Sequence, residues 1–148
     1  MNRKLLIAGG GVIAAGLLIA VLRPEGPADQ SQTAAAVDPA PGAAMVTVSL
    51  PENLSAQAQL GKRAFEAKCA VCPGQNAAGQ NGTAPPLVHR IYEPGHHADY
   101  AFQMAAKNGV QAHHWTFGNM PPIQGLTPSD VSNIVAYVRA LQQANGIN

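Results

Sequence analysis

Apolar residues recur every three to four positions in three segments of the second half of the chain, a spacing that places them on one face of a helix. These segments are residues 55–68, 98–107 and 127–144. Ser55 is a suitable N-cap for the first segment, and Gly61 within it indicates close packing, because glycine disfavours a helix interior. Asn108 and Gly109 form a C-cap after the second segment. The pattern predicts an all-α fold in which three helices are separated by long loops.

The last segment has the clearest helix signals in the chain. Thr127 is an N-cap, Pro128 occupies the first helical position, and Asp130 stands three residues after the cap. The apolar stripe of this helix comprises Val131, Ile134, Val135, Val138 and Leu141. Asn145 and Gly146 then end it.

The N-terminus carries a long apolar run behind a positive flank. Arg3 and Lys4 precede Leu5 to Leu22, an uncharged stretch of about 18 residues that is just long enough to cross a bilayer as a helix. We therefore expect residues 1–23 to be an uncleaved anchor in the bacterial inner membrane, with the rest of the chain on the periplasmic face. The alternative is a signal peptide cleaved in the region 34–36, which gives a soluble periplasmic protein.

Composition divides the remaining chain into two parts. Residues 24–49 are rich in Pro, Ala, Gly, Asp and Gln and have few large apolar side chains, which predicts a flexible linker. Residues 46–50 alternate like a short strand, but a single strand has no partner here and can equally be extended chain. The folded domain is then predicted to span residues 50–148.

Charge and size exclude several classes of function. The formal net charge is +1 and no run of lysines and arginines occurs, so nucleic-acid binding is not expected. A domain of about 100 residues buries only roughly 60% of its unfolded surface, so a large bound group would help to build its core. The sequence has no recognisable carboxylate pair and no arrangement of a nucleophile with its base, which are the usual signs of a catalyst. We expect no enzyme activity.

The two cysteines of the chain, Cys69 and Cys72, stand three residues apart. Cys-x-x-Cys followed by His is the attachment signature of c-type haem, and Pro73 takes the place of that histidine here. Other uses of the pair remain open. A zinc or copper site could combine both thiolates with a histidine and Met120, and the two thiols could instead form a local disulfide. A thioredoxin-like dithiol is disfavoured because the chain lacks a βαβ pattern.

The order of these motifs resembles the class I cytochrome c family over the region from Ser55 to Ala144. The match comprises Gly61 and Phe65 before the Cys-x-x-Cys motif, the loop Thr83–Leu87, the loop Gly118–Pro122, and Tyr137 and Leu141 in the last helix. The resemblance implies a domain of three to four helices with long loops around a haem crevice. It also implies that the first and last helices pack against each other.

The resemblance further implies a haem-binding electron carrier with one haem c per chain. Cys69 and Cys72 would hold the haem covalently, and Met120 would be an axial iron ligand. The expected partners are redox proteins of a respiratory or other electron-transfer chain, in addition to the membrane at the N-terminus. Because acidic and basic residues nearly balance in the domain, we expect weak docking with a modest salt dependence.

Pro73 departs from the family pattern, because its side chain has no atom that can bind iron. The family's bond from the proximal imidazole to a loop carbonyl, here that of Pro85 or Pro86, would be lost as well. The sequence therefore predicts an impaired or five-coordinate iron site. A haem-free cytochrome-like domain with a Cys69–Cys72 disulfide, and a zinc or copper module, are the alternatives.

Five histidines follow the Cys-x-x-Cys motif, and some of them are candidates to replace the missing iron ligand. The candidates are His89, His113 and His114. Adjacent side chains point in different directions on a regular backbone, so the pair His96/His97 and the pair His113/His114 are not expected to chelate one metal ion.

Overall fold

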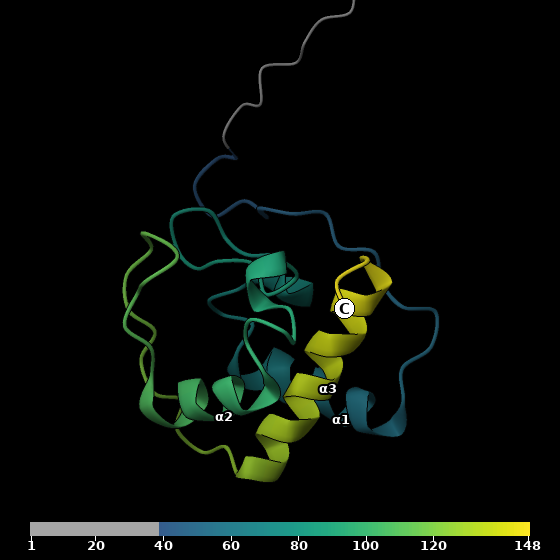
Figure 1. Cartoon of the computed structure of the whole chain (residues 1–148). Coiled ribbons are helices and arrows are strands. Elements are labelled where there is room, and N and C mark those ends of the chain that lie inside the picture. The colour runs from purple at the N-terminus through teal and green to yellow at the C-terminus, as the bar shows by residue number, and fades with distance from the viewer. Residues whose placement is uncertain (1–38) are drawn as a thin grey trace, which may run out of the picture. The chain divides into compact units, whose positions relative to one another are not determined.

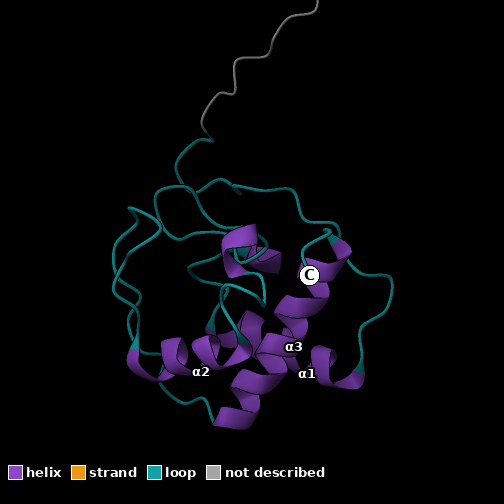
Figure 2. Cartoon of the chain, viewed as in Figure 1, coloured by secondary structure: helices purple, strands orange, loops and turns teal. Residues whose placement is uncertain are grey.

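The computed structural model of this protein describes residues 39–148. The helices are α1 (Ala56–Lys68), η1 (Gln75–Ala77), η2 (Arg90–Tyr92), α2 (Asp99–Asn108) and α3 (Pro128–Ala144). Long loops connect them, and the described part of the chain contains no strand (Figure 2). The predicted all-α fold is confirmed, and each of the three long helices lies within two residues of its predicted bounds.

The predicted membrane anchor, Leu5 to Leu22, lies outside the described residues. Between residue 39 and the C-terminus, none of the helices combines the length and the apolar character needed to cross a bilayer.

Helix α3 crosses α1 at the centre of the domain (Figure 1). A Cβ atom on Gly61 would overlap the main-chain carbonyl of Asn133, so the two backbones meet where only glycine fits. Beside this crossing the rings of Phe65 and Tyr137 lie 5.6 Å apart, and both side chains are buried. The expected packing of the first helix against the last is confirmed. The core comprises Phe65, Val88, Ile134, Tyr137, Val138 and Leu141.

Both predicted N-caps are present. The Ser55 hydroxyl accepts a hydrogen bond from the Ala58 N–H at 3.1 Å and starts α1. At the start of α3, Thr127 Oγ1 accepts from the Asp130 N–H at 3.2 Å, and Asp130 Oδ2 accepts from the Thr127 N–H at 2.9 Å. These bonds to Thr127 lower the pKa of Asp130, because they stabilise its carboxylate form.

The segment before α1 is extended chain that packs on the domain. Val46 and Val48 are half-buried against the core, and the N–H of Val46 donates to the Ala78 carbonyl at 3.1 Å. Asn145 exchanges two hydrogen bonds with the main chain of Ser49, at 2.9 and 2.8 Å. Val46, Val48 and Ser49 belong to the segment predicted as a flexible linker, so that prediction is wrong for its last residues. The apolar side chains of the two valines explain why this part packs on the domain.

A polar network joins α3 to the loop that surrounds η2. Gln142 is fully buried, and its Nε2 donates to the carbonyls of Leu87 and Tyr92 at 2.8 and 2.9 Å. Arg139 donates to Gln142 Oε1 at 2.6 Å and to the Tyr92 carbonyl at 2.6 Å. Because buried polar atoms are costly to leave unpaired, this network fixes the loop relative to α3.

Candidate functional site

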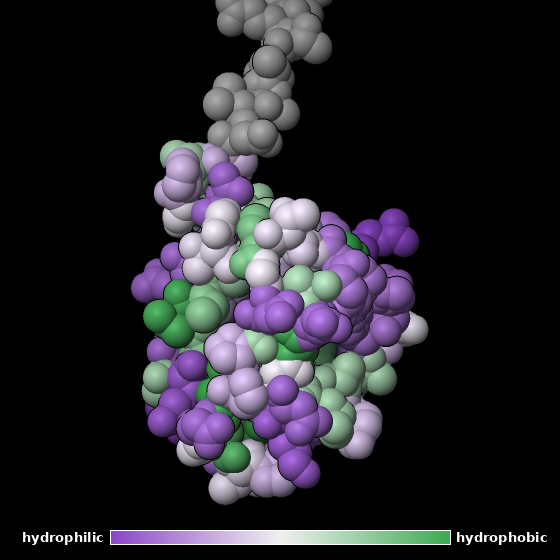
Figure 3. Space-filling view, turned by 90° about the vertical axis from the view of Figure 1, so that its left-hand side faces the viewer, coloured by the Kyte–Doolittle hydropathy of each residue, from purple (hydrophilic) through white to green (hydrophobic). Residues whose placement is uncertain are grey.

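A cavity of about 570 Å³ lies between the helices and the loop that joins α2 to α3. Its wall is mostly apolar and includes Phe65, Leu87, Phe102, Val110, Ile123 and Val131. Figure 3 shows apolar residues scattered among polar ones on the face that carries this loop. A cavity of this volume and character suits a large, mainly apolar ligand.

The Cys-x-x-Cys segment begins where α1 ends, and both cysteines line the cavity. Cys69 caps the helix through its N–H, which donates to the Phe65 carbonyl at 2.7 Å. The Gln80 side chain then donates from Nε2 to the carbonyls of Val71 and Cys72, at 2.9 and 2.8 Å. Gln80 thereby holds the attachment segment in place. Sequence reasoning missed this residue, because a glutamine eight residues beyond a cysteine carries no recognisable signal.

The two thiols differ in their surroundings. Both are free, but Cys69 is partly buried and Cys72 is exposed. Burial, and secondarily the neighbouring Cys72, raises the pKa of the Cys69 thiol to about 11. Cys69 is therefore protonated at neutral pH and is a weak nucleophile.

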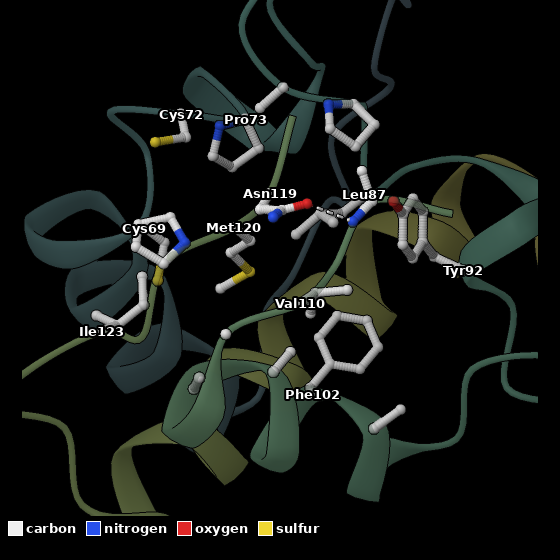
Figure 4. Close-up of a pocket in the computed structure, with 18 of the residues that line it drawn as sticks. Cys69, Cys72, Pro73, Leu87, Tyr92, Phe102, Val110, Asn119, Met120 and Ile123 are labelled. Atoms are coloured by element: carbon white, nitrogen blue, oxygen red, sulfur yellow. Dashed lines mark hydrogen bonds between the residues drawn. The ribbon is translucent and has the colours of Figure 1, made fainter. Parts of the chain in front are cut away.

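Met120 points into the cavity from the α2–α3 loop (Figure 4). The main chain of Met120 exchanges two hydrogen bonds with Val110, both 2.9 Å long. Gly109, at φ +75°, precedes this pair, and a Cβ there would press against the Met120 carbonyl. Asn119 adds a third tie, because its Oδ1 accepts from the Ala112 N–H at 2.9 Å. The loop thus presents the Met120 sulfur on a well-supported backbone.

Pro73 lines the same cavity and offers it no ligand atom (Figure 4). Its carbonyl accepts a hydrogen bond from the Gly79 N–H at 2.7 Å, which closes the loop around η1. Of the two prolines considered as acceptors for a proximal histidine, Pro85 lines the cavity, whereas Pro86 is fully buried beside Gly79.

The structure separates the three histidines suggested as replacement iron ligands. His113 and His114 line the cavity, as does His97. His89 is not among the lining residues, and its Nδ1 accepts from the Ile91 N–H at 3.2 Å while its ring packs on Trp115 at 5.2 Å. Iron ligation by any of the three stays a prediction.

The expectation that adjacent histidines point apart was wrong for these pairs. The rings of His96 and His97 lie 4.8 Å apart, and those of His113 and His114 lie 4.3 Å apart. Both pairs stand in turns rather than on regular backbone, so the alternation of a strand does not apply. Partial desolvation, followed by the neighbouring imidazoles, lowers the pKa of His114.

The two cysteines have no comparable group of potential metal ligands around them in the described region. Within residues 39–148, no histidine, aspartate or glutamate completes a group of three potential metal ligands with Cys69 and Cys72. The described region therefore gives little support to a zinc or copper site built on the thiols.

Trp115 supplies a test of what the cavity can hold. Its indole Nε1 is buried and has no hydrogen-bond partner among the described residues. Burial raises the pKa of Tyr92, and the neighbouring Trp115 side chain opposes this rise. An orphaned donor beside an apolar cavity fits a ligand that brings its own acceptor. The propionate groups of a haem are such acceptors, and the thiols and the Met120 sulfur fit its attachment and ligation.

Comparison with known proteins gives one match. Searches of curated proteins and of solved structures found no similar protein. The family model described as Cytochrome c matches residues 58–142, which is more than half of the chain and runs from α1 to the end of the buried part of α3. The matched region contains the cavity, both cysteines, Pro73 and Met120. The chain belongs to the cytochrome c family.

Proposed function

We propose that this protein is a one-electron carrier of the c type whose iron has a single strong protein ligand from the family's usual pair. Cys69 and Cys72 would hold the haem covalently, and Met120 would bind its iron. The observation that carries this proposal is the apolar cavity with two thiols and one thioether on its wall, and proline where the family has histidine. Haem-binding electron transfer itself follows from family membership.

The bound haem would supply the redox centre, and the chain would control its surroundings. The apolar wall excludes water, and a thioether ligand favours ferrous iron, so both features raise the reduction potential. The ties from Met120 to Val110 hold the ligand loop in one position during electron transfer. Limited movement of the ligand keeps the reorganisation cost low on the Met120 side.

Pro73 leaves the other side of the iron without its usual ligand. We infer that the iron is five-coordinate, or holds water, in the protein as it stands. Such iron binds carbon monoxide in its ferrous form, and ligand exchange slows its electron transfer. His113 and His114 are near enough to the cavity to compete for that position.

We also propose that the domain is exported and tethered by residues 5–22 to the periplasmic face of a bacterial inner membrane. The support is the apolar run behind Arg3 and Lys4 in the sequence. Its partners would be other redox proteins of an electron-transfer chain. Recovery with washed membranes of a chain that retains Met1 would support the tether, whereas a soluble form that starts near residue 34 would replace it with a cleaved signal.

The decisive experiment compares the natural chain with Pro73→His, both produced in cells that attach haem c. The natural protein should show a Soret band, keep its haem after denaturation, and shift its ferrous spectrum on addition of carbon monoxide. Pro73→His should give a low-spin spectrum that resists carbon monoxide. The double variant Cys69→Ser/Cys72→Ser is the control for covalent attachment and should lose the haem on denaturation.

Two results would contradict the proposal. A natural protein whose ferrous form is already low-spin and resists carbon monoxide has a replacement ligand, and His113→Ala and His114→Ala then identify it. A natural protein without a Soret band, in which the two cysteines form a disulfide, is a haem-free cytochrome-like domain.

A further inference from the structure

Four histidines from two loops gather at the edge of the cavity. His96 and His97 precede α2, whereas His113 and His114 follow it. One ring nitrogen each from His96, His97 and His114 lies within 4.8 Å of the other two, and His96 Nε2 lies 3.3 Å from His114 Nε2. The loops before and after α2 thus place three imidazoles next to one another.

The hydrogen bond of His97 to the main chain leaves its other ring nitrogen free to bind a ligand. His97 Nδ1 lies 2.5 Å from the Ile91 carbonyl oxygen, which can only accept, so Nδ1 carries the proton. The lone pair of His97 is then on Nε2. Histidines that bind metals are commonly oriented in this way, with one nitrogen donating to a carbonyl and the other on the metal.

Hydrogen bonding and ion pairing do not explain why three imidazoles lie this close together. At most one proton can lie between His96 Nε2 and His114 Nε2, and charging several rings this close together is unfavourable. No carboxylate belongs to the group, so ion pairing within it does not explain its assembly. A metal ion would satisfy all three nitrogens at once.

We propose that His96, His97 and His114 form a binding site for one divalent first-row transition metal ion of the class that imidazole prefers, namely Zn²⁺ or Cu²⁺. Three histidines are a known ligand set for Zn²⁺, and a fourth position would be open to water. The ring of His113 lies 4.3 Å from that of His114, and its Nδ1 lies 2.8 Å from the Gln111 carbonyl, so the lone pair of His113 is on Nε2. His97 and His114 line the cavity of the proposed function and His96 does not, so the metal site would lie at the edge of that cavity; its binding of Zn²⁺ can be measured whether or not haem is attached.

A metal ion there would link the two loops that border the cavity. The loop before α2 is already held by α3, because Arg139 Nη2 donates to the His97 carbonyl at 2.5 Å. The loop after α2 continues into the pairing of Val110 with Met120. Bound metal would therefore stiffen the wall of the cavity on the side of Met120.

The test is a calorimetric titration with Zn²⁺ of the untagged full chain, purified in detergent and freed of metal with a chelator. The background variant Cys69→Ser/Cys72→Ser is titrated in parallel, so that any thiolate binding is recognised. We expect one Zn²⁺ per chain in both proteins. His96→Ala and His114→Ala, at exposed positions that do not endanger folding, should each weaken binding at least about tenfold, as even loss of an outer-shell partner does.

His89→Asn is the matched control, because His89 lies outside the cluster and asparagine can still accept from the Ile91 N–H. It should bind Zn²⁺ like the natural chain. Titration with Cu²⁺ should give an electron paramagnetic resonance spectrum with coupling to several nitrogens, lost in His96→Ala/His114→Ala. Absence of stoichiometric Zn²⁺ binding, or equal binding by the cluster variants, would overturn the proposal.

Discussion

Arg139 fixes the loop that carries His97: its Nη2 donates to the His97 carbonyl at 2.5 Å, and its Nε forms an ion pair with Asp99 at 2.8 Å. The guanidinium also lies 5.0 Å from the centre of the Phe102 ring, which lines the cavity. One side chain of α3 thus connects the histidine cluster, the start of α2 and the cavity wall. Five donors in a fixed plane allow arginine, and not lysine, to make this set of contacts.

Replacing Arg139 with glutamine should therefore destabilise the domain. Gln142 Oε1 and the carbonyls of Tyr92 and His97 would lose a charged donor; the Tyr92 carbonyl keeps its bond from Gln142 Nε2, but each of the other two acceptors left unpaired costs about 1–3 kcal/mol. We expect a loss of at least about 2 kcal/mol in the free energy of unfolding, measured by urea denaturation. Arg63→Gln, at an exposed position of α1, should change it by less than about 0.5 kcal/mol. Equal effects of the two variants would show that the network contributes little.

Gly61→Ala should also destabilise the domain. The new methyl group would overlap the Asn133 carbonyl, so α1 and α3 must move apart. Overpacking of this kind costs about 1–3 kcal/mol, and backbone against backbone lies at the upper end of that range. Gly95→Ala is the control, because a methyl group there meets nothing within 4 Å. Thermal melting of both variants checks this, and a Gly61→Ala variant as stable as Gly95→Ala would contradict the crossing.

The sequence predicted the helices better than the site, and particular residues show why. Thr127, Pro128 and Asp130 act through local bonds, so the pattern alone was sufficient to place the start of α3. Gly61 likewise indicated that another part of the chain packs closely against its helix, although the spacing could not identify Asn133 as the contacting residue. The helix bounds and the packing of α1 on α3 were both predicted.

The surroundings of the site depend on contacts that span long stretches of sequence. His96 meets His114 across 18 positions, and Arg139 reaches His97 across 42. No periodicity relates such residues, because the loops that carry them lack regular structure. The rule for adjacent side chains also failed at His96 and His97, since turns do not alternate. The Cys-x-x-Cys motif could be read because its function depends on local spacing.

The two cysteines should differ in reactivity when no haem is attached. Burial raises the pKa of Cys69 from 9.0 to about 11, so at pH 8 its thiolate fraction is about a hundredfold lower than that of a thiol with the unshifted value. Iodoacetamide at pH 8 should therefore modify the exposed Cys72 well before Cys69. The rate at Cys69 should rise as the pH approaches 11. Peptide mass spectrometry after timed quenching measures both rates, and equal labelling at pH 8 would contradict the burial of Cys69.

Met120 and Met104 both line the cavity, and they provide a matched pair for the axial ligand. Met120 stands on the loop pinned to Val110, whereas Met104 belongs to α2. Because a thioether ligand favours ferrous iron, Met120→Ala should lower the reduction potential of the haem-loaded protein and change its spectrum. Met104→Ala removes a similar volume and should leave the spectrum unchanged. A spectrum altered only by Met104→Ala would assign the ligand to α2 instead.

Replacing Trp115 should change the stability of the domain by an amount that depends on the haem. In haem-free protein the buried Nε1 has no partner, so Trp115→Phe removes an unsatisfied donor and loses only packing. In haem-loaded protein the same change should also remove a charge-assisted hydrogen bond to a propionate, which contributes about 1.5–3 kcal/mol. The loss of unfolding free energy should thus be larger with haem than without it, and comparison of the two states cancels the packing term. Urea denaturation of Trp115→Phe and the natural chain, each with and without haem, measures this difference. Equal losses in both states would mean that Trp115 does not face a propionate.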